Sequence, residues 1–218
     1  MLSARETANV GLDTYETIRD DIIFGRLMPG EKLKLDALKA RYKVSISTLR
    51  EMLNRLSGEG FVVAQEQRGF SVSPMSEKNL REMADLRILV ESHALEMSIN
   101  NGDTEWEGRI VAAHHKLHLT ERQIEAGDKS IKETWKRYDW EFHQTLIHAC
   151  GSSALLDVHG AIFDKYLRYQ MRVNDIRGVE TVQSHQELLD AALARDVGLA
   201  KLALLHHIET GVEHCLKN

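Results

Sequence analysis

Two side chains that can bind a metal ion, Asp139 and His143, lie four residues apart in the chain. On a helix this spacing places both side chains on one face, one turn apart. A carboxylate and an imidazole in this arrangement can chelate one divalent ion. The chain contains 11 histidines, so a pair at this spacing also arises by chance. The pair alone is therefore only a weak indication of a metal site.

Two further histidines, His185 and His207, strengthen this hypothesis. They lie at equal distances from a predicted break between two helices near Asp196. In an antiparallel helical hairpin, residues equidistant from the turn sit at the same height, here roughly 16 Å from it at about 1.5 Å per residue. His185 and His207 can therefore face each other across the hairpin. His206 competes with His207, but its apolar neighbours indicate a packing position.

If the four side chains meet, three helices supply one aspartate and three histidines to one divalent ion. Imidazole and carboxylate ligands together suit Zn, Ni, Mn or Fe and single out none of them. We therefore expect one divalent metal per chain, with Zn in the purified protein. The alternative is that the same residues form a hydrogen-bonded polar core without metal. The histidines without a partner at ligand spacing are interpreted as surface or packing residues: His114, His115, His118, His148, His159 and His214.

The elements that must hold these ligands are predicted to be helices of a C-terminal domain, residues 77–218. This part of the sequence shows no convincing strand, and the whole chain has only 2 prolines, which suits a helix-rich fold. Glycines near the helix ends separate six predicted helices. They span residues 77–99, 103–125, 129–149, 153–174, 179–195 and 197–216. Six helices over this length form an antiparallel bundle.

The first part of the chain has a different pattern, in which helical spacing of apolar residues gives way to short alternating segments. The predicted elements are helices at 14–27, 35–42 and 46–57 and strands at 61–65 and 70–73. Three helices followed by a β-hairpin form a winged helix-turn-helix, expected over residues 12–73. A linker at 74–76 joins it to the bundle. The expected fold class is therefore mainly α.

The third of these helices has the features of a helix that reads DNA. Leu49, Leu53 and Leu56 form a buried stripe, which leaves polar side chains on the outer face. Residues 32–55 hold seven basic and two acidic side chains, and this local excess suits a phosphate backbone. The candidate DNA contacts are Arg41, Ser45, Ser47, Thr48, Arg50, Arg68 and Gly69.

Three of these candidates have a plain structural alternative. Arg50 could read a guanine edge or contact a phosphate, or it could simply form an ion pair with Glu51 or another near neighbour. Arg68 and Gly69 lie at the tip of the predicted hairpin. A basic residue there suits a wing that touches the minor groove or the DNA backbone, whereas the alternative is a solvated turn.

Composition limits the location and the class of protein. The first 11 residues lack an apolar run, so no signal peptide is expected there. No stretch reaches the roughly 20 apolar residues that span a bilayer. Cys150 and Cys215 are too few for a disulfide scaffold and are expected to be free thiols. We expect a cytoplasmic protein without membrane contact.

The N-terminal pattern resembles the DNA-binding domain of the GntR family of regulators over about residues 12–73. The matching segments are residues 25–33, Leu38, Val44-Ser45, Leu49-Arg50-Glu51, Leu53, Leu56, Glu59-Gly60 and residues 68–72. In that family this element is a dimeric winged helix, so the resemblance implies a homodimer on double-stranded operator DNA. The sequence departs from the family pattern at Ile46, where a base-reading arginine is usual, and at Asp36, where a basic residue is common.

Residues 77–210 resemble the FCD effector domain of the FadR branch of this family. The matching positions are Arg87-x3-Glu91, Asp139-x3-His143, Gly151, His185, Arg195-Asp196, Ala200 and His207. In many members an aspartate and three histidines hold a divalent metal, and a carboxylic acid effector binds beside it. The resemblance therefore implies that the four residues singled out above are metal ligands. The six-helix count resembles the VanR-like subgroup.

The same resemblance implies that Arg87 faces the effector pocket and pairs with the carboxylate. The alternative is a surface ion pair between Arg87 and Glu91. Tyr166, Tyr169 and Arg172 on the helix at 153–174 are further pocket candidates, although aromatic residues at helical spacing also occur simply as core.

The expected function is that of a transcription regulator that acts as a repressor of a catabolic operon. A small carboxylic acid bound near the metal would release or modulate it. One alternative is a DNA-binding dimer whose helical domain is structural only. A metal-dependent enzyme is the other, although the sequence shows no separate general base, nucleophile or cofactor motif.

Overall fold

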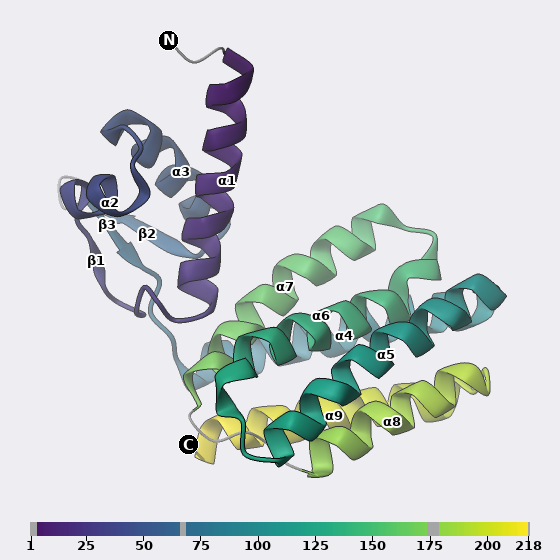
Figure 1. Ribbon diagram of the computed structural model, residues 1–218. Coiled ribbons are helices and arrows are strands. Elements are labelled where there is room, and N and C mark those ends of the chain that lie inside the picture. The colour runs from purple at the N-terminus through teal and green to yellow at the C-terminus, as the bar shows by residue number, and fades with distance from the viewer. Residues whose placement is uncertain (1–3, 66–68, 174–178, 218) are drawn as a thin grey trace. The chain divides into compact units, whose positions relative to one another are not determined.

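The computed structural model describes residues 4–65, 69–173 and 179–217. The chain divides into two compact units, Met1–Ser76 and Glu77–Asn218. The first unit contains helices and a small antiparallel sheet, and the second is a helical bundle (Figure 1). The expected fold class, a mainly α protein with a winged helix-turn-helix followed by a bundle, is confirmed.

The N-terminal unit contains three helices and a three-stranded sheet among its described residues. Its elements are α1 (Ala4–Ile23), β1 (Lys32–Leu33), α2 (Leu35–Tyr42), α3 (Ile46–Gly58), β2 (Val62–Gln65) and β3 (Gly69–Val72). The strand order is β1-β3-β2, with Leu33 opposite Phe70 and Val62 opposite Val72. Strands β2 and β3 form the predicted hairpin. Strand β1 was not predicted, because two residues are too few to show an alternating pattern.

Helix α1 differs from its predicted span of residues 14–27 at both ends. It begins at Ala4, and residues 4–13 contain no proline that would stop a helix earlier. It ends at Ile23 because Gly25 adopts a left-handed backbone with φ of 76°. The chain then turns back, and the backbone N–H of Leu27 donates to the carbonyl of Asp21 at 2.8 Å.

The buried stripe of α3 packs within the N-terminal unit as expected. Leu49, Leu53 and Leu56 are fully buried, together with Ile18 and Ile22 of α1. Burial of these apolar side chains provides the main stabilisation of the small unit. It also fixes which face of α3 remains exposed.

The C-terminal unit contains six α-helices among its described residues. They are α4 (Glu77–Asn101), α5 (Thr104–Glu125), α6 (Lys132–Ile147), α7 (Ser153–Arg172), α8 (Val179–Leu193) and α9 (Val197–Lys217). The single helix expected at 129–149 is instead divided into η1 (Lys129–Ile131), α6 and η2 (His148–Cys150). The Asp128 side chain caps η1 by accepting from the Ser130 N–H, and Gly151 ends η2 with a left-handed φ of 74°.

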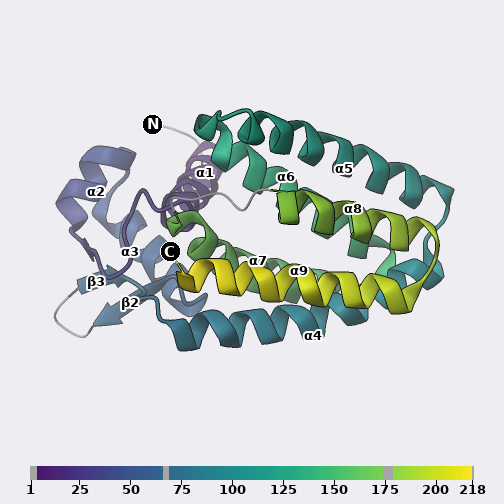
Figure 2. The ribbon, with the colours of Figure 1, turned by 90° about the horizontal axis from the view of Figure 1, so that it is seen from below.

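The packing of these helices brings α6, α8 and α9 around one interior. Helix α4 lies against α7 and α9, α5 lies against α6 and α8, and α8 and α9 form a hairpin (Figure 2). The hairpin turn lies at the predicted position: Arg195 has a φ of 57°, and Asp196 Oδ1 accepts from the Leu199 N–H. Polar side chains from α6, α8 and α9 therefore meet inside the bundle.

The start of α5 provides a test of the local structure. Asp103 caps the helix by accepting from the Trp106 N–H at 2.8 Å, and Trp106 is fully buried. A side chain at Gly102 would bring its Cβ within 2.3 Å of the Trp106 ring, so glycine is required there. Asp103→Ala should lower the free energy of unfolding by about 1 kcal/mol. Urea unfolding followed by circular dichroism would measure it, with exposed Glu105→Ala as the control. Equal stability of the two variants would contradict the capping role.

Candidate metal centre

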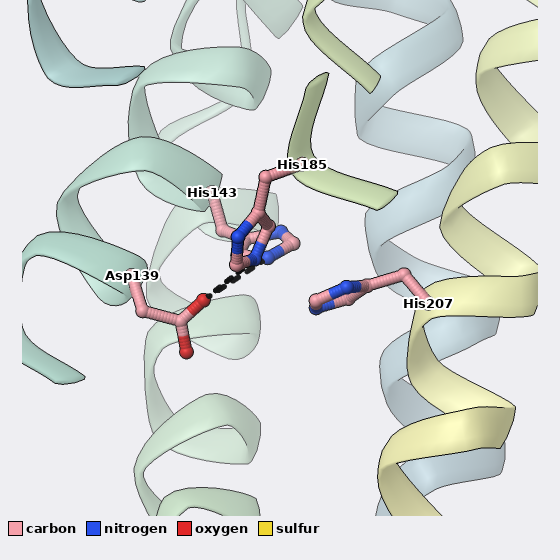
Figure 3. Close-up of side chains that lie close together, drawn as sticks. All are labelled: Asp139, His143, His185 and His207. Carbon is pink, nitrogen blue, oxygen red and sulfur yellow. Dashed lines mark ion pairs between the residues drawn. The ribbon is translucent and has the colours of Figure 1, made fainter. Parts of the chain in front are cut away.

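The four candidate metal ligands meet in the interior of the bundle (Figure 3). Asp139 and His143 lie one turn apart on α6, His185 comes from α8 and His207 from α9. All four side chains are buried, and their ligand atoms lie within 4.8 Å of one another. His206, in contrast, is exposed and lies beside a surface groove between α8 and α9. Its interpretation as a packing residue is therefore wrong, because its apolar neighbours lie on the outer face of α9.

Several ligand atoms are buried without a hydrogen-bond partner. They are Asp139 Oδ1, His143 Nε2 and His185 Nε2. Asp139 Oδ1 lies 3.1 Å from His185 Nε2 and 3.7 Å from His143 Nε2. A buried polar atom without a partner costs about 1–3 kcal/mol, and a divalent cation would be a partner for all of these atoms at once. The donor set of one carboxylate and three imidazoles therefore fits a divalent metal.

The outer nitrogens of two ligand histidines are held by buried carboxylates. His143 Nδ1 lies 2.5 Å from Glu91 Oε1, and His185 Nδ1 lies 2.6 Å from Glu121 Oε1. A carboxylate oxygen accepts, so Nδ1 carries the proton in both rings. In His143 this leaves the lone pair on Nε2, directed into the cluster. Burial lowers the pKa of His185, but its contacts with Asp139 and Glu121 outweigh burial and raise it. A cation in the cluster would therefore take the place of a proton on His185 Nε2. Such outer partners fix the orientation of metal-binding histidines and raise their basicity.

The third histidine and the aspartate are oriented in the same way. Ser184 Oγ donates to the Thr181 carbonyl at 2.8 Å, so it accepts from His207 Nδ1 at 2.9 Å. Asp139 Oδ2 accepts from Lys136 Nζ at 3.0 Å, while Oδ1 faces the histidines. Each ligand thus has one atom held by the protein and another directed into the cluster.

The charges of the cluster also suit a cation. Burial opposes ionisation of Asp139, but Lys136 and His185 outweigh it and hold the pKa of this carboxyl well below its usual range. Burial lowers the pKa of His143 to about 4. Burial and the neighbouring imidazoles of His185 and His143 lower the pKa of His207 well below its usual value. Near neutral pH the site therefore offers a carboxylate and at least two uncharged imidazoles.

Arg87 is buried beside this cluster. Its Nε donates to Glu91 Oε2 at 2.7 Å, and neither side chain is exposed. The ion pair with Glu91 is thus formed, but in the core and not at the surface. The guanidinium carbon lies 4.3 Å from the ring centre of Phe163 and 5.2 Å from that of Tyr166. The terminal nitrogens Nη1 and Nη2 are buried without a hydrogen-bond partner.

The other predicted effector contacts lie on α7, where Tyr166 packs against Arg87 as described above. The Tyr169 hydroxyl donates to Asn79 Oδ1 on α4 at 2.8 Å, which ties the two helices together. Arg172 is exposed in the last turn of α7. Among the four predicted pocket residues, Arg87 is therefore the one that shares a buried carboxylate with a candidate metal-ligand histidine.

The predicted DNA contacts on α3 lie at its exposed N-terminal end. Ser45 caps the helix, accepting from the Thr48 N–H at 3.1 Å. Ser45, Ser47 and Arg50 are exposed, and Thr48 is half-buried. Within the part of the chain that the structure describes, Arg50 forms no ion pair with Glu51.

The remaining DNA candidates have different surroundings. Arg41 Nη2 donates to the buried carboxylate of Asp21 at 2.5 Å, and Tyr42 donates to the same oxygen at 2.6 Å. Part of the Arg41 side chain is therefore engaged within the N-terminal unit. Gly69, at the start of β3, is exposed with a φ of 84°. Arg68 lies outside the described residues.

Sequence reasoning missed the residues that orient the ligands. Glu121, Lys136 and Ser184 carry no motif of their own, and His159 was interpreted as a surface or packing residue. The apolar spacing of the helices was the available signal, since it places Glu121 on the buried face of α5 and Lys136 on that of α6. A charged residue on a buried face needs a partner.

Comparisons with known proteins agree with both halves of this structure. Residues 11–72 match the family model described as bacterial regulatory proteins, gntR family, and residues 82–210 match the FCD domain. The chain belongs to the GntR family. It is 36% identical to the HTH-type transcriptional regulator BphR of Paraburkholderia xenovorans, over 91% of this chain and 82% of that protein. It is 33% identical to the HTH-type transcriptional repressor GlaR of Escherichia coli, over 92% and 93% of the two chains.

A solved structure has the same fold. The structure titled E. coli McbR/YncC covers 100% of this chain with a TM-score of 0.81, at 18% identity and 99% coverage of its own chain. The GntR family and these relatives are DNA-binding transcription regulators, so the alternative of a metal-dependent enzyme is set aside. Among the residues that the structure describes, no helix is both long and apolar enough to span a bilayer.

Proposed function

We propose that this GntR regulator represses a catabolic operon and leaves its operator when a small carboxylic acid binds next to a divalent metal in the FCD domain. The observation that carries the proposal is the pair of buried, unpartnered nitrogens of Arg87. A carboxylate can accept from two guanidinium nitrogens at once. Arg87 is joined to the metal-ligand residue His143 through a single carboxylate, that of Glu91.

The residues around Arg87 suit an acid of small size. A divalent ion at Asp139, His143, His185 and His207 would supply a Lewis-acidic partner for a carboxylate oxygen. Arg87, on α4, would supply a positive charge that pairs with the carboxylate of the acid. Its ring contacts with Phe163 and Tyr166 keep the guanidinium away from bulk water, where its attraction for an anion would be weaker.

Repression and dimerisation are supported by the family and by the exposed face of α3. GlaR, a relative of similar length, is named as a repressor. Regulators with a helix-turn-helix read two half-sites, which requires two copies of the recognition helix. Acid binding would favour a second arrangement of the bundle, change the separation of the two winged helices and lower operator affinity.

The test combines a metal analysis with a screen of acids. Zn(II)-loaded full-length protein is screened by thermal shift against small carboxylic acids, and the acids that stabilise it are added to a gel-shift assay with its own promoter. We expect at least one acid to raise the melting temperature and to release DNA. A protein that binds no metal and responds to no acid, yet binds DNA, would support a helical domain that is structural only.

Arg50 provides a test of the DNA-binding face. Arg50→Ala should weaken operator binding by about 1–3 kcal/mol if the side chain reads a base. If it contacts a phosphate, binding should weaken for all DNA sequences. The slope of log binding constant against log salt concentration should then become shallower by about one unit. Fluorescence anisotropy at several salt concentrations distinguishes the two. Arg172→Ala removes one exposed charge from the other unit and should leave binding unchanged. Unaltered binding by Arg50→Ala would remove α3 from the interface.

A further inference from the structure

Glu91 lies at the centre of a buried network that joins Arg87 to a metal ligand. Its Oε1 accepts from His143 Nδ1 at 2.5 Å, and its Oε2 accepts from Arg87 Nε at 2.7 Å. All three side chains have no exposed surface. A rotation of this carboxylate therefore alters both contacts together.

A third donor, His159 of α7, also holds this carboxylate. His159 Nε2 lies 2.9 Å from Glu91 Oε2, and its Nδ1 lies 2.8 Å from Gln144 Nε2. The amide nitrogen of Gln144 donates, so His159 Nδ1 accepts and Nε2 carries the proton. His159 is thus a buried imidazole whose N–H is aimed at Glu91 by a residue of α6, the helix that carries Asp139 and His143.

The third donor changes how Arg87 and Glu91 pair. An arginine and a carboxylate usually form two parallel hydrogen bonds. Here Glu91 accepts from Arg87 through Nε alone, while His143 occupies one oxygen and His159 shares the other. Without the His159 donor, the carboxylate would be free to turn and accept from an Arg87 terminal nitrogen as well. That turn would withdraw Oε1 from His143.

We propose that His159 is a positioning residue that locks Glu91 between His143 and Arg87. This hydrogen bond keeps the imidazole of His143 oriented toward the metal site. It also keeps the terminal nitrogens of Arg87 available to an anion. The second half of this inference rests on the proposed function, in which Arg87 binds the acid. The first half concerns the metal alone, and so does its test.

The test compares three variants of the full chain, with Co(II) as the probe. His159→Leu removes the donor, and His159→Gln places an amide N–H near the position of Nε2. His115→Leu is the control, since His115 is an exposed histidine of α5. We expect His159→Leu to weaken Co(II) binding about 10-fold or more and to shift the visible spectrum of bound Co(II). His159→Gln should restore most of the affinity, and His115→Leu should keep the wild-type spectrum.

A second readout follows Arg87 without any acid. The Nε–H resonance of Arg87, identified by its loss in Arg87→Lys, should shift when Zn(II) is added to the wild type. The shift should be much smaller in His159→Leu, because the carboxylate no longer links the two sites. If His159→Leu does not fold, as judged by circular dichroism, Gln144→Leu removes the group that aims His159 and should weaken Co(II) binding in the same direction.

The outcomes separate the two proposals. A folded His159→Leu with wild-type Co(II) affinity and spectrum would overturn this inference and leave the proposed function standing. An Arg87 resonance that does not respond to Zn(II) would overturn the link through Glu91. A wild-type protein that binds neither Co(II) nor Zn(II) would overturn the proposed function and this inference with it.

Discussion

His185→Ala and His207→Ala should each lower the affinity of the purified protein for Zn(II) by more than roughly 100-fold, beyond the cost of an outer-shell change. Each substitution removes one of four protein ligands whose donor atoms lie within 4.8 Å of one another. It also leaves the remaining ligand atoms buried without a partner, because the cluster is closed to water. Elemental analysis and competition with a chromophoric chelator would measure the loss.

The matched control for these variants is His206→Ala. His206 neighbours His207 on α9, but its side chain is exposed and points about 100° away around the helix. This variant should keep one ion per chain. Because metal binds the folded state, a chelator should lower the melting temperature of wild type and of His206→Ala, and should have little effect on the two ligand variants. A requirement for His206, or wild-type protein that cannot be loaded, would contradict the site.

The four candidate ligands could be singled out from the sequence because helix geometry groups them in two pairs, and the resemblance to the FCD domain joins the two pairs in one site. The spacing of Asp139 and His143 fixes a shared face, and equal distances from the turn near Asp196 fix the height of His185 and His207. The structure brings these residues together as that geometry requires. Neither step depends on the packing of particular side chains.

The residues that orient the ligands could not be predicted in this way. Glu121 reaches His185 from α5, and His159 reaches Glu91 from α7, so both contacts depend on which helices are neighbours. A pattern of apolar spacing gives the buried face of a helix but not the helix that faces it. For the same reason, sequence alone could not show that the pair of Arg87 and Glu91 lies in the core.

In the N-terminal unit, the exposed face of α3 could be predicted from the sequence, but the contacts between its helices could not. The buried leucines of α3 indicated which face would be exposed, and Ser45, Ser47 and Arg50 lie there. The engagement of Arg41 by Asp21 was not visible, because the two residues are 20 positions apart and belong to different helices. A basic residue in a charged stretch is therefore a weaker DNA candidate than one placed by the helix period.

Arg87→Met should lower the affinity for the acid found by the screen by more than about 100-fold. Truncating one partner of a buried, hydrogen-bonded charge pair costs a bound complex about 2–5 kcal/mol, and Arg87 is a buried cation with two unpartnered terminal nitrogens. Arg87→Lys keeps the charge beside Glu91 but lacks the planar fork, so it should fall between Arg87→Met and wild type. Isothermal titration of the Zn(II)-loaded proteins would measure the three affinities.

The same variants should separate acid sensing from DNA binding. Operator affinity without acid should survive in Arg87→Met, because the substituted residue lies in the FCD domain and the recognition helix lies in the other unit. Release of DNA by the acid should be lost. Arg172→Met removes an exposed arginine of the same domain and should respond to the acid as wild type does. If Arg172→Met lost the response and Arg87→Met kept it, the acid would bind near the end of α7, and the buried guanidinium would have a purely structural role beside Glu91.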